Sequence, residues 1–213
     1  IMAKAGFAID GGRSEKIVIS APSQDNLTFY IKGKAAHAGV HPEHGISAIR
    51  VAAEAIGKIK HGRLDKETTA NIGTIHGGVA TNIVAETVEV KCEARSRSDK
   101  KLKKQSRHMR EVFKSACRKY GAKLKIEHIR MYDAFRLDKK SLPLRLVRRT
   151  GRRFILTDGG GGSDANVINK LGVPTAILGV GGKGAHTTKE NLFIPDFIAG
   201  TQQLVDIVKV VSK

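Results

Sequence analysis

Residues 27–35 read Leu-Thr-Phe-Tyr-Ile-Lys-Gly-Lys-Ala, and apolar side chains alternate with polar ones along this stretch. A period of two is typical of a strand with one buried face. A helix is expected next, because apolar residues recur at steps of three and four between Gly45 and Gly62. Two further strands are predicted. One covers 68–75 and ends before Gly77-Gly78, and the other covers 87–95 and carries apolar residues at alternate positions.

A second helix should begin at Ser98-Asp99, since these side chains can accept hydrogen bonds from free backbone amides, and should end at Gly121. A last strand is expected around Leu124, Ile126 and Ile129. The order strand-helix-strand-strand-helix-strand is that of the ferredoxin-like unit, an antiparallel sheet with both helices on one face. We therefore predict a ferredoxin-like domain over residues 25–137.

The two flanks of this unit have a different character. Short apolar strands are expected at 5–9 and 16–21, and the nearly continuous apolar run 173–180 suits a strand buried on both faces. Helices are expected over 144–152, 163–171 and 197–211, the last with Ile198, Leu204, Val205, Val208 and Val211 inward. The sequence thus predicts an α/β domain built from 1–24 and 138–213, interrupted by the ferredoxin-like insertion.

The net charge of +18 over 213 residues is concentrated in one region. Residues 95–153 hold 22 Lys or Arg and 5 Asp or Glu. A surface this basic can attract nucleic acid or another polyanion by counterion release. Few aromatic side chains interleave with the charges, so a base-stacking surface is not favoured, and a solvated helix face accounts for the same pattern.

Cysteine content and hydropathy give further expectations. Cys92 and Cys117 lack the spacing of a zinc knuckle or a redox pair, so buried thiols are expected. No leader-like segment and no apolar run of about 20 residues is present, which favours a cytoplasmic protein without a membrane span.

Several polar side chains stand at the ends of the expected strands. Asp10 follows the first strand and precedes Gly11-Gly12, and His186 follows the glycine-rich stretch 179–184. A carboxylate and a neutral imidazole can both bind zinc, although position alone favours a turn aspartate and an ordinary loop histidine.

The expected ferredoxin-like domain has three such candidates of its own. His37 can donate to a developing oxyanion, Asn82 can donate to and accept from a peptide, and the guanidinium of Arg95 suits a carboxylate. An exposed loop position for His37 and an exposed strand end for Arg95 explain these two residues without any function. The four glycines 159–162, before Ser163, permit close backbone approach of a ligand or form a plain flexible loop.

Together these stretches resemble the di-zinc exopeptidase family that contains peptidase T, carboxypeptidase G and the aminoacylases, and most closely its peptidase T-like members. The resemblance extends over essentially the whole chain. Its most specific parts are the stretches 33–39, 42–48, 69–82, 93–96, 161–166 and 186–190.

The resemblance implies a role for each candidate. Asp10 and His186 correspond to ligands of the two zinc ions, one residue to each ion. His37 corresponds to a lid histidine that polarises the scissile carbonyl, often across a dimer, and Arg95 to the arginine that binds the substrate carboxylate. Asn82 corresponds to a substrate contact, and Gly161, Gly162 and Ser163 to the pocket lining. The ferredoxin-like domain would then be a lid that forms a homodimer, and the substrate a short peptide.

The family's other zinc ligands and its catalytic glutamate have no counterpart in this chain. Two ligands on two ions fall short of the usual three or four. The resemblance therefore predicts a zinc peptidase in its complete form and no hydrolysis by this chain alone. Two alternatives stay open, namely a non-enzymatic dimerisation or regulatory module and, less favoured, a nucleic-acid binder that uses residues 95–153.

Overall fold

The computed structural model describes residues 2–212, and these form two compact units. Unit 1 combines Ile1–Pro22 with Tyr132–Lys213, and unit 2 is the continuous segment Ser23–Met131. The chain therefore leaves unit 1, completes unit 2 and returns to unit 1.

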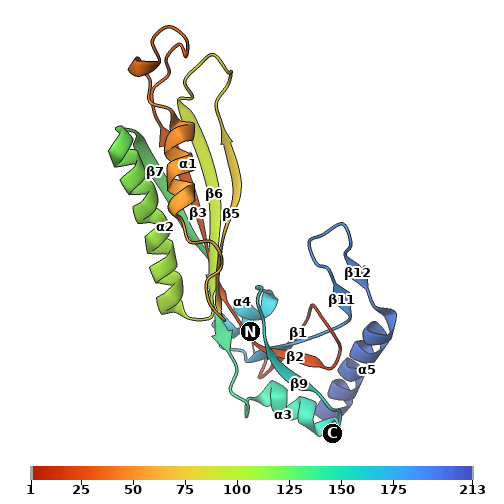
Figure 1. Ribbon diagram of the computed structural model, residues 1–213. Helices are drawn as coiled ribbons and strands as arrows, with labels where there is room; N and C mark the ends of the chain where they lie inside the picture. The colour runs from red at the N-terminus through yellow and green to blue at the C-terminus, as the bar shows by residue number, and fades with distance from the viewer. Residues whose placement is uncertain (1, 213) are drawn as a thin grey trace. The chain divides into compact units, whose positions relative to one another are not determined.

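Unit 2 is an antiparallel sheet with two helices (Figure 1). The strand order is β4-β5-β6-β3-β7. The strands are β3 (Ser23–Lys32), β4 (Gly62–Arg63), β5 (Thr68–Gly77), β6 (Thr87–Ser96) and β7 (Lys123–Tyr132), and the helices are α1 (Ala48–Lys58) and α2 (Asp99–Tyr120). Apart from the short β4, the order along the chain is the predicted strand-helix-strand-strand-helix-strand.

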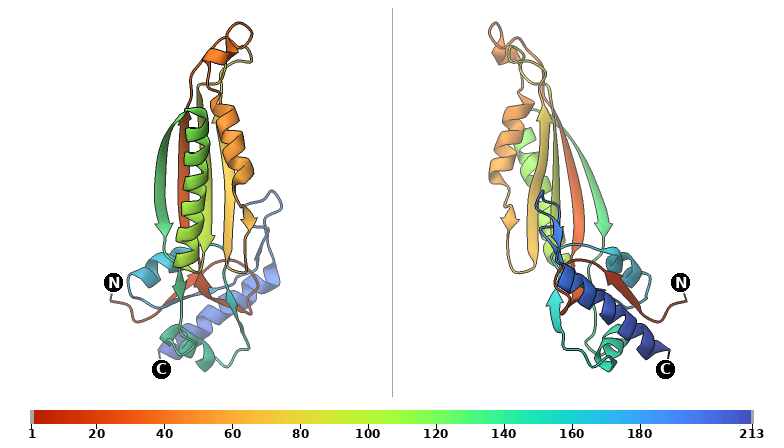
Figure 2. Two further views of the ribbon diagram at one scale, coloured as in Figure 1. Left: turned by 60° about the vertical axis from the view of Figure 1, so that its left-hand side comes forward. Right: turned by 90° about the vertical axis from the view of Figure 1, so that its right-hand side faces the viewer.

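Both helices of unit 2 cover the same face of the sheet, as the views of Figure 2 show. Their apolar stripes meet the inward side chains of β3 and β6, and the rings of Phe29 and Phe113 stack at 3.8 Å between centroids. The predicted helix ends are also present, since Ser98 Oγ accepts from Lys101 N at 3.4 Å and Gly121 adopts a left-handed conformation with φ 70°.

Unit 1 contains a five-stranded mixed sheet. Strand β10 lies between β1 and β2, parallel to β1 and antiparallel to β2, and β2 also pairs with β8 and, in parallel, with β9. The strands are β1 (Gly6–Ile9), β2 (Lys16–Ala21), β8 (Phe135–Arg136), β9 (Ile155–Asp158) and β10 (Thr175–Leu178). All four residues of β10 are buried, as its apolar run predicts.

The helices of unit 1 are α3 (Leu142–Arg149), α4 (Asp164–Lys170) and α5 (Ile194–Val211), and a small hairpin joins β11 (Gly182–Lys183) to β12 (Asn191–Leu192). The core packs Ile17, Ile19 and Leu178 against α3 and against Ile207 of α5. Strands β8, β9, β11 and β12 are not predicted from the sequence.

One prediction about α5 is wrong. The expected inward residues Ile198, Val205, Val208 and Val211 are exposed, and of the predicted set only Leu204 packs against the core. The buried positions are Gly200, Gln203 and Ile207. Apolar residues occur on all sides of this helix, so hydrophobic spacing does not identify its inner face.

Cys92 and Cys117 are both buried, as predicted. Burial raises the pKa of the Cys92 thiol to about 12 and that of Cys117 to about 11. In the part of the chain that the structure describes, no helix combines the length and the apolar character needed to cross a bilayer.

Candidate functional site

Asp10 stands where β1 ends, next to the end of β10. Its backbone N donates to Leu178 O at 3.0 Å, and the turn that follows it pairs with the chain beyond β10. Gly181 N donates to Gly12 O at 2.7 Å and Gly182 N donates to Gly11 O at 3.0 Å. Because β1 and β10 are parallel, their carboxyl ends meet at one edge of the sheet, and the exposed Asp10 side chain belongs to that edge.

The same turn is also held by α5. Asp196 Oδ1 accepts hydrogen bonds from Ser14 Oγ at 2.7 Å and from Ser14 N at 3.3 Å. The bond from Ser14 is the main reason that the pKa of Asp196 lies below its ordinary value. The backbone that carries Asp10 is thus tied at both ends, to β10 on one side and to α5 on the other.

His186 lies four residues beyond Gly182, in the loop that joins β11 to β12. It is exposed, and among residues 2–212 it is the only non-glycine residue with a positive φ, 63°. Its backbone N donates to Glu190 Oε2 at 3.0 Å. A left-handed backbone at such a residue costs of order 1–3 kcal/mol and is common at functional sites, which supports a role for His186 beyond loop formation.

The structure therefore joins the segments that carry Asp10 and His186 at one edge of unit 1. Both residue types suit zinc, but the described residues of unit 1 hold no group of three potential ligands. The donor types fit a zinc site and the number of donors does not.

Residues Gly161, Gly162 and Ser163 leave the sheet at the other end of β2. Strand β9 pairs with β2 in parallel, and Asp158 lies beside Ser20, whereas Leu178 lies beside Ile17. These glycines are therefore not next to Asp10. A Cβ at Gly162 would overlap the Tyr132 ring, so a packing requirement already explains this glycine.

Ser163 also has a structural role, as the first residue of a capping box on α4. Its Oγ accepts from Ala165 N at 3.2 Å, and its N donates to Asn166 Oδ1 at 3.0 Å. Asn166 is buried, and its amide donates to Pro22 O and Asp133 O at 3.0 and 2.7 Å. Sequence reasoning assigned no role to Asn166, although an asparagine three residues after a capping serine was a visible signal.

In unit 2 the structure brings His37 and Asn82 together. Ala38 N donates to Asn82 O at 2.9 Å, and His37 forms an isolated β-bridge with Ile83. The segments 35–49 and 77–85 thus form one exposed end of unit 2, which we call the tip (Figure 1).

The His37 ring is oriented by its own turn. Nδ1 accepts from Gly39 N at 3.2 Å, so the proton of the neutral ring is on Nε2. Nε2 is then a donor with no hydrogen-bond partner in the described part of the chain, and it can donate to a carbonyl oxygen. This is the hydrogen bond that polarisation of a carbonyl requires.

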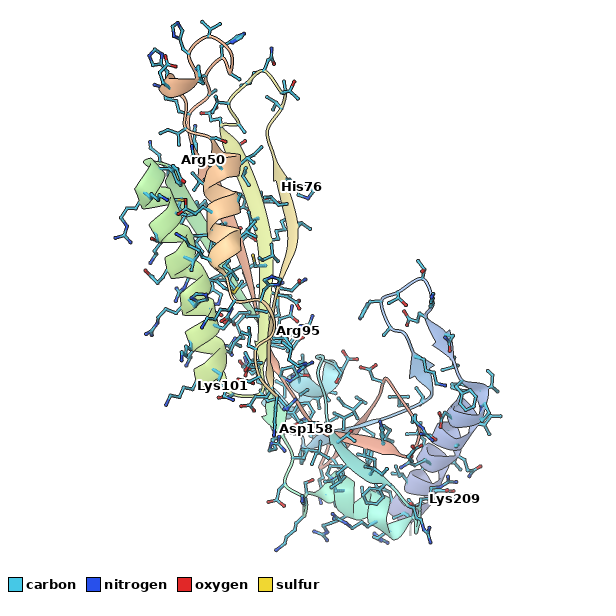
Figure 3. The ribbon with its side chains drawn as sticks, in the orientation of Figure 1. Arg50, His76, Arg95, Lys101, Asp158 and Lys209 are labelled. Carbon is cyan, nitrogen blue, oxygen red and sulfur yellow. The ribbon has the colours of Figure 1, made fainter. Side chains whose placement is uncertain are left out.

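Arg95 lies at the opposite end of unit 2 from the tip. It is near the end of β6, opposite Gln24 and Thr69, and Figure 3 shows it far along the sheet from His76, which borders the tip. Its guanidinium holds the Glu93 carboxylate through Nε to Oε1 at 2.9 Å and a second nitrogen to Oε2 at 2.8 Å. Arg95 therefore binds a carboxylate in the bidentate geometry expected of it, although that carboxylate is internal.

The basic stretch 95–153 belongs to both units. Its residues are divided between unit 2 and unit 1 at the boundary between Met131 and Tyr132. Several lysines of α2 are already paired with acids, as Lys101 is with Asp65 and Glu67 and as Lys119 is with Glu54.

Comparison with known proteins identifies the class. Residues 23–121 match the M20 model described as "Peptidase dimerisation domain", which covers most of unit 2. This chain belongs to the M20 peptidase family, of which it has the dimerisation domain and part of the catalytic domain.

The similar proteins include two bacterial peptidases of known structure. The chain is 41% identical to the aminopeptidase PepT of Bacillus cereus, with a TM-score of 0.86, and aligns over 100% of its own length and 58% of that chain. It is 38% identical to a tripeptidase of Staphylococcus aureus, with a TM-score of 0.91 and the same coverage. It is 39% identical to the uncharacterized protein YqjE of Bacillus subtilis, over 100% of this chain and 59% of YqjE. The chain thus spans somewhat under three-fifths of the length of these relatives.

Proposed function

We propose that the complete protein is a zinc-dependent peptidase of the peptidase T type, which hydrolyses short peptides such as tripeptides. Residues 25–137 would form its lid and dimerisation domain, and 1–24 with 138–213 a part of its catalytic domain. The observation that carries the proposal is the parallel pairing of β1 with β10, because it joins the segments of Asp10 and His186 at one edge. Two of the similar proteins are an aminopeptidase and a tripeptidase, which supports the choice of substrate class.

The residues of unit 2 have separate tasks in this proposal. His37 donates from Nε2 to the scissile carbonyl oxygen, and the donation strengthens as negative charge develops there. Asn82 contacts the peptide beside His37. Arg95 binds the terminal carboxylate with its planar guanidinium. Gly161, Gly162 and Ser163 line the pocket in addition to their structural roles.

His37 and Arg95 are too far apart to serve one peptide from a single chain. The strand between Thr87, which adjoins the tip, and Arg95 rises about 3.4 Å per residue, or about 27 Å in all. An extended tripeptide spans at most about 11 Å. A homodimer removes this difficulty, because His37 of one chain can then reach the site that contains Arg95 of the other.

Zinc would be held by Asp10, by His186 and by further ligands outside this chain. Asp10 and His186 supply a carboxylate oxygen and an imidazole nitrogen, which are ordinary zinc ligands. When bound, zinc supplies Lewis-acid chemistry to the substrate.

The first test compares this chain with a chain extended to the full length of its gene. We expect the long chain, loaded with zinc, to hydrolyse tripeptides, and the 213-residue chain to bind zinc weakly at Asp10 and His186 and to hydrolyse none. Zinc titration and a tripeptide assay on both chains measure this. Hydrolysis by the short chain, or none by a folded and zinc-loaded long chain, contradicts the proposal.

The two alternatives predict different outcomes of the same experiment. A dimerisation module predicts a long chain that dimerises and hydrolyses nothing. A nucleic-acid binder predicts retention on DNA that falls steeply with added salt and is lost when Lys100, Lys101, Lys103 and Lys104 are neutralised.

A second prediction concerns the Glu93 carboxylate, which forms an ion pair with the Arg95 guanidinium. In the long chain, Glu93→Gln should lower KM for peptides by up to about fivefold, because a partly exposed ion pair that the substrate must break is worth up to about 1 kcal/mol. Steady-state kinetics measure the change. The matched control is Glu89→Gln, which removes the pair with Lys91 on the same strand and should leave KM unchanged. A rise in KM on Glu93→Gln would instead assign Glu93 the role of orienting Arg95.

A further inference from the structure

The tip carries a cluster of potential metal ligands that the proposed peptidase does not use. His41, Glu43 and His44 each offer one ligand atom, and these atoms lie within 4.8 Å of one another. No other group of three such residues occurs among residues 2–212. All three side chains are more than half exposed, which leaves room for an incoming ion.

The distances within the cluster approach those of a tetrahedral zinc site. Bonds of about 2.0–2.1 Å place two ligands of a tetrahedral ion about 3.3 Å apart. The distance from His41 Nδ1 to Glu43 Oε1 is 3.3 Å, and that from His44 Nε2 to the same oxygen is 3.8 Å. The two imidazoles stack at 5.0 Å with 17° between their planes, so they must rotate to face one ion. Exposed side chains rotate at little cost.

The backbone beneath the cluster is already ordered. Pro42, Glu43 and His44 form the short helix η1 (Pro42–His44). His41 N donates to His37 O at 3.1 Å, His44 N to His41 O at 3.2 Å, and Gly45 N to Pro42 O at 3.0 Å. A site on a fixed backbone loses little conformational entropy when an ion binds.

Local charge also permits a cation here, although the chain carries +18. Neither segment of the tip, 35–49 or 77–85, contains a lysine or an arginine. Glu43 is the only carboxylate in the two segments. A divalent cation therefore meets one negative charge and no cationic side chain within the segments that form the tip.

We propose that His41, Glu43 and His44 form a surface site for a divalent transition ion such as Zn²⁺, with water as a fourth ligand. Two imidazoles and one carboxylate are a donor set that suits zinc, nickel and copper and disfavours calcium and magnesium, which prefer oxygen. His37 O accepts the first hydrogen bond of the turn that holds the site, from His41 N. A bound ion therefore stiffens the segment that follows His37. The site itself does not depend on peptidase activity.

Titration of the untagged chain with Zn²⁺ by calorimetry, and with Co²⁺ by visible absorption, tests this proposal. We expect one ion to bind per chain. The Co²⁺ complex should have the visible absorption spectrum of tetrahedral coordination. The double variant His41→Gln/His44→Gln should weaken binding by more than about tenfold, since loss of outer-sphere partners alone costs roughly 10–100-fold at metal sites. Glu43→Gln should weaken it to a lesser degree. Circular dichroism should show the same melting curve for all variants, because the altered side chains are exposed.

Two controls separate this site from the others in the chain. His76→Gln removes an exposed histidine of β5 that borders the tip, and it should leave the titration unchanged. Asp10→Ala/His186→Ala removes the proposed catalytic ligands, and it should also preserve the ion at the tip. The buried thiols do not compete, since burial raises the pKa of both. Undiminished binding by the His41→Gln/His44→Gln variant, loss of binding in the Asp10→Ala/His186→Ala variant, or no binding by the unmodified chain would overturn the proposal.

Discussion

A mixture of His37→Ala and Arg95→Ala chains, each at full gene length and allowed to exchange subunits, will recover about a quarter of the unmodified peptidase activity. Each variant alone will be nearly inactive. Loss of an oxyanion donor such as His37 costs about 10²–10³-fold in kcat. This experiment has the largest expected effect on activity, because the mixture regains what both of its components lack.

The recovery follows from the geometry of unit 2. A two-fold dimer that pairs His37 of one chain with Arg95 of the other has two equivalent sites. In a dimer of the two variants, one site has both residues intact and the other has neither. Random pairing makes about half of the dimers mixed, so about a quarter of all sites are whole.

The control is a mixture of the double variant His37→Ala/Arg95→Ala with His37→Ala, in which no site can have both residues. Native mass spectrometry verifies subunit exchange in both mixtures. Exchange without recovery would show that His37 and Arg95 act from one chain, and the proposed trans arrangement would then be wrong. An inactive unmodified long chain would contradict the peptidase function itself, so the two failures are distinguishable.

The second prediction concerns Asp25, a buried carboxylate that joins three elements of unit 2. Its side chain is 1% exposed on β3. Its carboxylate accepts hydrogen bonds from Ser106 Oγ of α2 at 2.7 Å and from Arg130 Nε of β7 at 2.5 Å. The same carboxylate lies 3.0 Å from His128 Nε2. Replacement by alanine leaves the buried Ser106 hydroxyl and the Arg130 guanidinium without their shared acceptor. We expect Asp25→Ala to lower the free energy of unfolding by about 3 kcal/mol, the lower end of the range for breaking a buried ion pair. The loss is at the lower end because Arg130 retains its ion pair with Asp99.

This destabilisation should depend on pH in one direction. Burial works against ionisation of Asp25, but hydrogen bonds from Ser106, Arg130 and His128 outweigh it and hold the pKa of the carboxyl below its ordinary value. Such a group stabilises the folded state above its unfolded pKa of about 3.9, and the contribution is lost as pH falls through the lowered value. The difference in free energy of unfolding between the unmodified protein and the variant should therefore be largest at neutral pH and decrease below about pH 4.

Thermal and urea unfolding followed by circular dichroism measure this effect, since the chain has no tryptophan. The matched control is Asp99→Asn, which removes the exposed partner of Arg130 and Lys103 and should change stability by less than about 1 kcal/mol. Equal stability of Asp25→Ala and the unmodified protein would mean that the three elements do not depend on this carboxylate.

The sequence predicts unit 2 well because its signals are local and agree with one another. The alternation over 27–35, the apolar stripe of α1 and the caps Ser98 and Gly121 all predict the elements that the structure contains. Strands β3 and β6 bury the side chains of one face more deeply than those of the other, which produces a clear period of two. Short apolar strands require partners, and for this reason the sequence predicts that the two flanks share one domain.

Unit 1 is less predictable for physical reasons. Strand β9 has four residues and β8, β11 and β12 have two, too few to show any period. Their existence depends on partners far away in sequence, as when Phe135 pairs with Ala21. The inner face of α5 could not be read either, because valine and isoleucine occur around the whole helix.

Only part of the candidate site could be anticipated. The segments around Asp10 and His186 lie together because β1 pairs with β10, and the contact of His37 with the Asn82 loop also depends on backbone pairing between distant segments. Sequence spacing did not indicate that Glu93 occupies Arg95, since this depends on two side chains two residues apart on one face of β6. The packing role of Gly162 was equally hidden, because it depends on contact with Tyr132. The capping box of Ser163 and Asn166, in contrast, left a signal in the spacing of the two residues.

The two-segment origin of unit 1 also orders events during biosynthesis. Strand β2 is synthesised before β10, but Ile17 and Val18 pair with Leu178 and Ile177, which are made on the order of ten to thirty seconds later at about 5–20 residues per second. Unit 2 is a continuous segment and can fold in that interval. During the same interval the apolar strand β2 remains unpaired with β10. Nascent chains of this protein should therefore bind chaperones through 16–21 until translation passes β10.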